Sequence, residues 1–154
     1  MQNVHVCIPL NKMNKVCKSE TKERQATDLT YVCYVDSSLA CRPCYIKHTI
    51  MWKRYLQLEK TNKIKFFFIF EVPETDLNKI KKEIQQSVIR NNSYVDTKTV
   101  FRLSNKFLPE ESVFHSFLLD KKNHIIMVGD PTYNESISHL LEKILIDRRI
   151  VNTN

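Results

Sequence analysis

The stretch LTYVCYVDSSLACRPCYIKHTIMWKRYLQLEK, residues 29–60, carries the strongest structural signal in this chain of 154 residues. Its first seven residues form a nearly continuous apolar run rich in β-formers, which is typical of a strand buried on both faces of a parallel sheet. From residue 45 the apolar side chains fall on one helical face and the basic side chains on the other. The stretch therefore predicts a buried strand, a short connection with two cysteines, and an amphipathic helix.

The same alternation continues downstream. The run IKFFFIFEV at 64–72 predicts a second buried strand, and Pro73 ends it. Apolar residues three or four positions apart then predict a helix over 75–90, capped by Thr75 or Asp76. Because strand–helix–strand connections within one sheet are right-handed, this order predicts two parallel strands side by side.

The second half of the chain predicts additions to this parallel unit. We expect a short strand near 94–96 and a short helix over 97–105, which together form an α/β insertion around 91–107. Two β-runs at 112–120 and 124–130 are separated by a Lys-Lys-Asn turn signal, which predicts an antiparallel hairpin. A final helix is expected after the capping residue Asn134.

The first 28 residues are weakly patterned and predict an N-terminal extension. VHVCIPL at 4–10 suits a short edge strand, since proline is tolerated at a sheet edge, and the charged stretch 18–28 suits a loop. Residues 29–150 are expected to form one domain. The fold class is therefore α/β, with a mixed central sheet flanked by helices, an N-terminal strand extension and an α/β insertion.

Composition narrows the classes of function. The net charge of +7 raises nucleic acid as a partner, but the lysines are scattered beside acids and form no basic stripe, so we expect none. No apolar run approaches the roughly 20 residues that cross a bilayer, so no integral membrane segment is expected. The single glycine, Gly129, excludes a glycine-rich phosphate loop. Asparagines are therefore expected at left-handed turns, namely Asn62, Asn91, Asn92 and Asn123.

The chemistry of the chain is expected at Cys41 and Cys44, which lie just past the carboxyl end of a buried strand, where open α/β sheets place functional groups. A helix N-terminus favours a thiolate over a thiol. The first cysteine is then the exposed nucleophile and the second, within the first helical turn, the more buried partner. Two alternatives stay open from the residues alone: a zinc site, which needs further ligands that spacing does not supply, and a purely structural pair.

The remaining cysteines and histidines give weaker signals. Cys33 lies in the middle of a strand and is expected to be a small buried hydrophobe. Cys7 and Cys17 are expected to be free thiols. His115 has two readings, either a proton acceptor near Cys41 or a polar residue that begins a strand.

Strand, CxxC helix, strand, helix, hairpin and terminal helix together resemble the thioredoxin-like fold. FLLDKKNHIIMVGDP at 117–131 and YVDSSLACRPCYIKHTIMWKRY at 34–55 are similar to bacterial envelope thioredoxin-like proteins of the TlpA/AhpC-TSA type. The chain departs from that pattern in three places. Ala40 replaces the usual aromatic, and Asp36 is five rather than six residues before the first cysteine. Val113, Phe114 and His115 stand where the family carries a cis-proline, so a trans bond is expected there.

The resemblance implies a thiol–disulfide oxidoreductase that acts on protein disulfides, with no cofactor and no metal. Cys41 would attack and Cys44 would resolve the mixed disulfide. Arg42 and Pro43 would tune the potential, and Phe114 and His115 would support the site. Partners would be protein thiol or disulfide substrates and a redox partner protein.

Two other functions remain as alternatives, a non-catalytic thioredoxin-like binding module and a thiol peroxidase. The CxxC spacing argues against the peroxidase. The resemblance implies a cell-envelope or periplasmic location if a leader was removed, and the cytoplasm otherwise.

Overall fold

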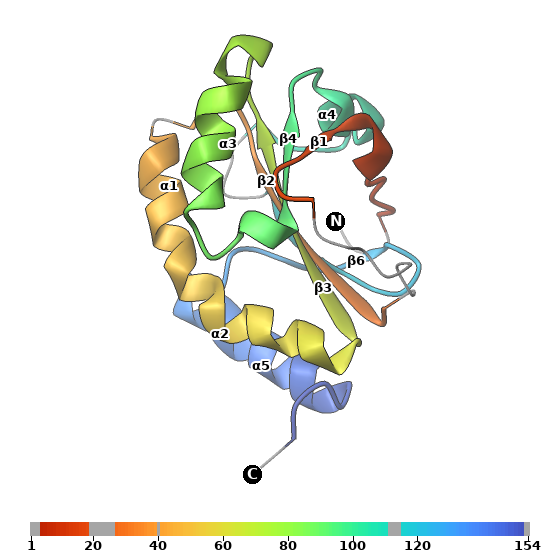
Figure 1. Ribbon diagram of the computed structural model, residues 1–154. Coiled ribbons are helices and arrows are strands. Elements are labelled where there is room, and N and C mark those ends of the chain that lie inside the picture. Colours follow the sequence, from red (N-terminus) through yellow and green to blue (C-terminus); the bar gives the residue numbers. More distant parts are fainter. Residues whose placement is uncertain (1–3, 19–26, 40, 111–114, 153–154) are drawn as a thin grey trace.

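The computed structural model describes residues 4–18, 27–39, 41–110 and 115–152. Its strands form one mixed sheet in the order β1-β4-β3-β2-β5-β6 (Figure 1). The bounds are β1 (Asn14–Lys15), β2 (Leu29–Val35), β3 (Ile64–Glu71), β4 (Ser93–Asp96), β5 (Ser116–Leu119) and β6 (Ile125–Val128). The predicted α/β class with a mixed central sheet is confirmed.

Strand β2 lies near the middle of the sheet and carries the connection to the cysteines. It pairs in parallel with β3 and antiparallel with β5, while β4 continues the parallel part beyond β3. Because both of its edges are paired and both of its faces are covered, all seven of its residues are buried. The apolar run at 29–35 is thus the doubly covered strand that the sequence predicts.

The helices largely follow the predicted order. The α-helices are α1 (Arg42–His48), α2 (Lys53–Leu56), α3 (Leu77–Gln85), α4 (Val100–Ser104) and α5 (Glu135–Asp147). The 3-10 segments are η1 (Leu10–Lys12), η2 (Thr49–Trp52), η3 (Gln57–Thr61), η4 (Glu74–Asp76) and η5 (Arg90–Asn92). Since α1, η2, α2 and η3 follow one another without a break, the predicted helix at 45–60 is one helical segment of mixed type.

Helices α1, α2, α3 and α5 cover one face of the sheet, and α4 with the N-terminal segment covers the other (Figure 1). The order of the strands explains this division. The crossovers from β2 to β3 and from β3 to β4 both step in the same direction across the sheet, so right-handed connections place α1 and α3 side by side on one face.

Trp52 is the centre of the larger apolar core. It is completely buried and lies edge-on to three rings, with centroid distances of 4.9 Å to Tyr31, 5.9 Å to Phe66 and 5.4 Å to Phe68. Such edge-to-face contacts add stabilisation beyond the area they bury. Trp52 therefore joins the cysteine-bearing helical segment to β2 and β3.

The prediction of an edge strand over 4–10 was wrong. The N-terminal strand is β1, which pairs antiparallel with β4, and the earlier residues make only an isolated bridge between His5 and His124. Pro9 and the η1 turn divide the segment, because proline donates no hydrogen bond to a neighbouring strand. The segment nevertheless packs on the sheet, since Val6 is completely buried.

Other boundaries differ in smaller ways. Helix α3 ends at Gln85 rather than continuing to residue 90, because the backbone N–H and the hydroxyl of Ser87 both bond to the carbonyl of Ile84. Asp76 occupies the cap position of α3 but makes no capping hydrogen bond. Most of the predicted loop at 18–28 and the first residues of the predicted hairpin lie outside the described residues.

Asparagine replaces glycine at two of the four expected turns. Asn62 and Asn123 have φ values of 58° and 62°, in the left-handed region that asparagine tolerates. Asn91 and Asn92 instead belong to η5. The predicted cap of the last helix is confirmed, because Asn134 Oδ1 accepts the Ile137 N–H at 3.1 Å.

We predict that Trp52→Ala lowers the free energy of unfolding by about 3–5 kcal/mol, because it leaves a cavity among three aromatic rings. Met51→Ala is the matched control, since Met51 is the preceding residue and is 54% exposed. Urea unfolding followed by circular dichroism measures both. Equal effects of the two substitutions would contradict the central role of Trp52.

Candidate functional site

Cys41 and Cys44 lie where the chain passes from β2 into α1, and they form a disulfide with Cα atoms 5.3 Å apart. Cys41 is the N-cap of α1, with an extended backbone, and its Sγ accepts the backbone N–H of Cys44 at 3.2 Å. Pro43 occupies the first helical turn, where its missing N–H costs no hydrogen bond. An N–H directed at the Cys41 sulfur favours its negatively charged form once the disulfide is reduced.

The expected difference in burial between the two cysteines was wrong. Cys41 is half-buried, whereas Cys44 is exposed. Helix α1 packs on the core through Ile46, and two helical positions separate Cys44 from Ile46 by about 200° around the axis. Cys44 therefore points away from the core.

Arg42 adds less positive charge at the cysteines than the sequence suggests. Its guanidinium lies 3.5 Å from the carboxylate of Asp76, and the two side chains are 25% and 42% exposed. Exposed pairs of this kind contribute little to stability. The pair does connect the start of α1 to the turn before α3.

Three carboxylates gather where the parallel strands β2, β3 and β4 end, at the carboxyl end of β2 from which the chain continues to the cysteines. Glu71 and Asp96 are the last residues of β3 and β4, and Asp36 directly follows β2. All three are buried. Carboxylates in such surroundings need hydrogen bonds and positive partners, since burial disfavours their charge.

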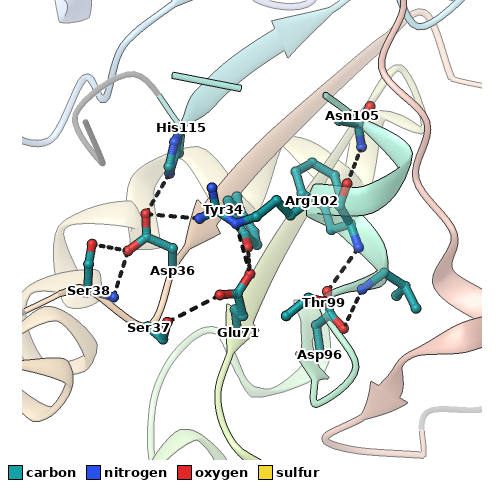
Figure 2. A network of polar contacts seen from close by, with 12 residues as sticks. Tyr34, Asp36, Ser37, Ser38, Glu71, Asp96, Thr99, Arg102, Asn105 and His115 are labelled. Carbon is teal, nitrogen blue, oxygen red and sulfur yellow. Dashed lines mark hydrogen bonds and ion pairs between the residues drawn. The ribbon is translucent and has the colours of Figure 1, made fainter. Parts of the chain in front are cut away.

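Arg102 from α4 bridges two of these carboxylates, as Figure 2 shows. Its guanidinium lies 3.4 Å from Asp36 Oδ2 and 3.4 Å from Glu71 Oε2. The hydroxyl of Tyr34 also donates to Glu71, and the arginine lies over the Tyr34 ring. One cation thus serves two buried anions.

His115 supplies a second contact to Asp36. The histidine is completely buried, and its Nδ1 lies 3.3 Å from Asp36 Oδ2, although it makes no hydrogen bond of good geometry within the described residues. Its Nε2 donates to the carbonyl of Pro109 at 2.5 Å, since a carbonyl only accepts. His115 therefore joins the residue that precedes β5 to the segment that ends at Pro109 and packs it against Asp36.

Asp36 also shapes the connection that leads to the first cysteine. Its Oδ1 accepts the backbone N–H of Ser38 at 2.9 Å and also bonds the Ser38 hydroxyl. The backbone N–H of Leu39 bonds to the carbonyl of Asp36. Hydrogen bonds therefore connect the network of buried charges to Leu39, two residues before Cys41.

Asp96 has a separate task. Its carboxylate accepts the backbone N–H groups of Val100 and Phe101 at the start of α4, at 3.0 and 2.9 Å. Buried N–H groups at a helix start need such acceptors. Asp96 therefore positions the helix that carries Arg102.

A second polar cluster lies on the opposite face of the sheet. Tyr45, on α1, lies close to the sulfur of Cys33, which is buried. Burial raises the pKa of the Cys33 thiol well above its usual range, and the charge of Asp130 adds to this shift. Cys33 is thus a neutral, buried thiol, as the sequence predicts, and Cys7 and Cys17 are also free.

Asp130 ends the hairpin and faces α1. Burial raises its pKa, although the backbone and hydroxyl of Thr132 both donate to it, at 2.8 and 2.5 Å. The same Thr132 hydroxyl bonds His48 Nε2 at 3.0 Å, and the His48 ring stacks on Tyr133. His48 is therefore fixed against the end of the hairpin.

The site residues predicted from sequence fall into three groups. The structure brings Cys41, Arg42, Pro43 and Cys44 together at the start of α1. It places His115 inward against Asp36, and Phe114 lies outside the described residues. The trans bond expected before His115 involves that same residue, so it is not described; the described part of the chain contains no cis peptide bond.

Sequence reasoning missed Arg102, Glu71 and Asp130. A signal for the carboxylates was present, since three β-runs each end in an acid, as the runs ending in Asp36 and Glu71 illustrate. No signal marked Arg102, because it lies on a short helix far from the cysteines in the sequence.

No metal site or membrane span is seen in the described ranges. They contain no group of three or more His, Cys, Asp or Glu side chains that is placed to hold a metal ion. Nor do they include a helix whose length and apolar character suit a membrane crossing.

Comparison with known proteins agrees with the fold. No protein-family model matches the sequence, and no curated protein matches it. Among solved structures, a candidate thiol:disulfide interchange protein DsbE from Chlorobium tepidum is similar, with a TM-score of 0.55 and 14% identity over 79% of this chain and 80% of that one. The chain has a thioredoxin-like fold.

Two further solved structures are similar to this chain. The thioredoxin domain of a thiol-disulfide oxidoreductase from Bacteroides vulgatus gives a TM-score of 0.51 and 15% identity, covering 77% of this chain and 80% of that one. A conserved protein of unknown function from Bacteroides fragilis gives 0.58 and 10%, covering 94% and 96%. The resemblance read from the sequence is therefore confirmed at the level of fold.

We predict that Arg102→Met lowers the free energy of unfolding by about 2 kcal/mol, because it leaves two buried carboxylates without their shared cation. The effect is below that of a fully buried pair, since the Arg102 side chain is 37% exposed. In a Glu71→Gln background the same substitution should cost less, as a double-mutant cycle in urea would show. Additive effects would contradict the shared charge balance.

A second prediction concerns pH. Because the pKa of Asp130 is raised in the folded protein, folding takes up protons there, and stability falls as pH rises from about 4 through the raised value. Asp130→Asn keeps an acceptor for Thr132 but removes this titration. The stability of the variant relative to the native protein should therefore increase between pH 4 and pH 7 in urea unfolding. Parallel pH curves for the two proteins would contradict the assignment.

Proposed function

We propose that the protein is a thiol–disulfide oxidoreductase that exchanges disulfides with other proteins through Cys41 and Cys44. The observation that carries this proposal is the disulfide itself, formed at a helix start with an N–H directed at the Cys41 sulfur. The thioredoxin-like fold supports it, and so do two similar structures, one named as a thiol:disulfide interchange protein and the other as a thiol-disulfide oxidoreductase.

The reaction balances as a two-electron exchange. In the reduced protein, the Cys41 thiolate attacks one sulfur of a protein disulfide, the substrate S–S bond breaks, and the departing thiolate takes a proton. Cys44 then loses its proton and attacks the Cys41 sulfur, which releases the second substrate thiol and restores the Cys41–Cys44 disulfide. A dithiol donor protein reduces that disulfide by the same steps in reverse.

The electrostatics favour Cys41 as the attacking thiol. The N–H of Cys44 points at the Cys41 sulfur, so the thiolate is stabilised there rather than on Cys44. The greater exposure of Cys44 does not change this order, because the resolving step needs only the short distance between the two cysteines.

His115 supports the site through Asp36 in this proposal. As His115 is completely buried against Asp36, it acts on the position of the connection to Cys41. Arg42 and Pro43 set the local charge and the backbone of the first helical turn, and Phe114 remains a predicted supporting residue.

The proposed partners are protein disulfide or dithiol substrates and a redox partner protein. We place the protein in the cell envelope, where protein disulfides persist. The alternative is a non-catalytic binding module in which the disulfide is structural. The observation that favours it lies in the sequence, because Val113, Phe114 and His115 stand where thioredoxin-like enzymes carry the cis-proline that aligns their substrates.

We predict that Cys41→Ser abolishes the reduction of insulin disulfides, because the attacking thiolate is lost. Cys44→Ser should instead accumulate a mixed disulfide that mass spectrometry detects, since the resolving thiol is missing. The variant Cys7→Ser is the control and should keep full activity, as Cys7 is an exposed free thiol far from the pair in the sequence. Unchanged turnover in Cys41→Ser would reject the enzyme and leave the binding module.

A further inference from the structure

A groove runs along the surface between α1 and α3 and begins at the disulfide. Its first section, of about 230 Å³, is lined by Leu39, Cys41, Arg42, Asp76, Lys79 and Glu83, among others. Its second section, of about 370 Å³, is lined by Pro43, Ile46, Lys47, Ile50, Glu83 and Val88, among others. Pro43 and Glu83 line both sections, so the two adjoin, and we call them together the α1–α3 groove.

The two sections differ in chemistry. The section beside Cys41 has a rim of alternating charges, with Arg42 paired to Asp76. The farther section is more apolar, because Ile46, Ile50 and Val88 contribute to it, and Ile50 is 53% exposed. An isoleucine this exposed, in a groove that starts at Cys41, is a surface that a partner can cover.

We propose that the α1–α3 groove binds the substrate polypeptide on one side of its reactive cysteine. This inference rests on the proposed function. A substrate sulfur bonded to Cys41 fixes one end of the substrate chain at the mouth of the groove, because Cys41 itself lines the first section. The flanking residues of the substrate then follow the groove away from the disulfide.

The geometry sets the kind of sequence that fits. Helical rise over the positions from Cys41 to Ile50 amounts to about 14 Å, which an extended peptide spans with about four residues. The groove therefore selects a substrate with polar residues next to its cysteine and a large apolar residue about four positions away. The substrate chain is then held at two points, by a disulfide to Cys41 and by apolar contact with Ile50.

Peptide kinetics test this selection. Short peptides carry one cysteine as a mixed disulfide with thionitrobenzoate, and leucine or serine occupies the position four residues before or after it. Attack of the reduced protein on the peptide sulfur releases thionitrobenzoate, which absorbance follows. We expect leucine on one side to raise kcat/KM about tenfold over serine, the range of a partly covered apolar contact. Equal rates for all peptides would overturn the groove.

Matched variants locate the effect. Ile50→Ser should remove the leucine preference, while Met51→Ser should keep it, since Met51 is equally exposed but is not among the residues that line the groove. Both variants should react normally with a small dinitrobenzoate disulfide, which has no peptide chain. A protein inert to the small disulfide overturns the proposed function and the groove together, whereas normal reaction without a peptide preference overturns the groove alone.

A trapped complex gives an independent measurement. In Cys44→Ser protein with Cys7 and Cys17 also changed to serine, the leucine peptide forms a stable disulfide with Cys41. Hydrogen exchange should then slow in α1 around Ile46 and in the turn around Val88. Slowing at other surfaces only, or an Ile50-dependent dimer in sedimentation without peptide, would show another occupant and overturn the proposal.

Discussion

The burial of β2 on both faces and along both edges is the constraint on which the rest of the structure depends. Its side chains alternate between two apolar cores, with Cys33 in one and Tyr34 in the other. A shift of one residue in the pairing of β2 would move every side chain to the opposite face of the sheet, so that Cys33 and Tyr34 would exchange cores and Asp36 would leave its network. The fixed register is what delivers Asp36 and the cysteines to one edge of the sheet.

Burying carboxylates where the parallel strands end is unfavourable, and the ion pairs and hydrogen bonds around Arg102 offset this free-energy cost. Asp36 and Glu71 arrive there because parallel strands end together, and each is buried. Arg102 on α4 supplies the opposite charge, and His115, which precedes β5, packs against Asp36. The connection to Cys41 therefore rests on a balanced cluster, and its position depends on α4 and β5 as well as on its own strand.

The disulfide is formed by residues close in the sequence, but its surroundings come from residues far from it in the sequence. Capping by Cys41 and the turn at Pro43 involve residues within one helical turn. The surface next to Cys41 is formed in part by α3, which lies beside α1 because both crossovers turn the same way. In the proposed function, reactivity would come from the helix start and selectivity from the neighbouring helix.

The amino-acid sequence by itself determined the buried strands, the long helical segment, the hairpin and the CxxC pair, because apolar periodicity and turn residues act over short distances. It did not determine the relative exposure of Cys41 and Cys44, the edge strand β1, or the partners of His115. Those depend on which face α1 buries and on contacts between residues far apart in the chain. Only the tertiary structure decided that Arg102 would lie between Asp36 and Glu71, since no short-range pattern records a meeting of three separate elements.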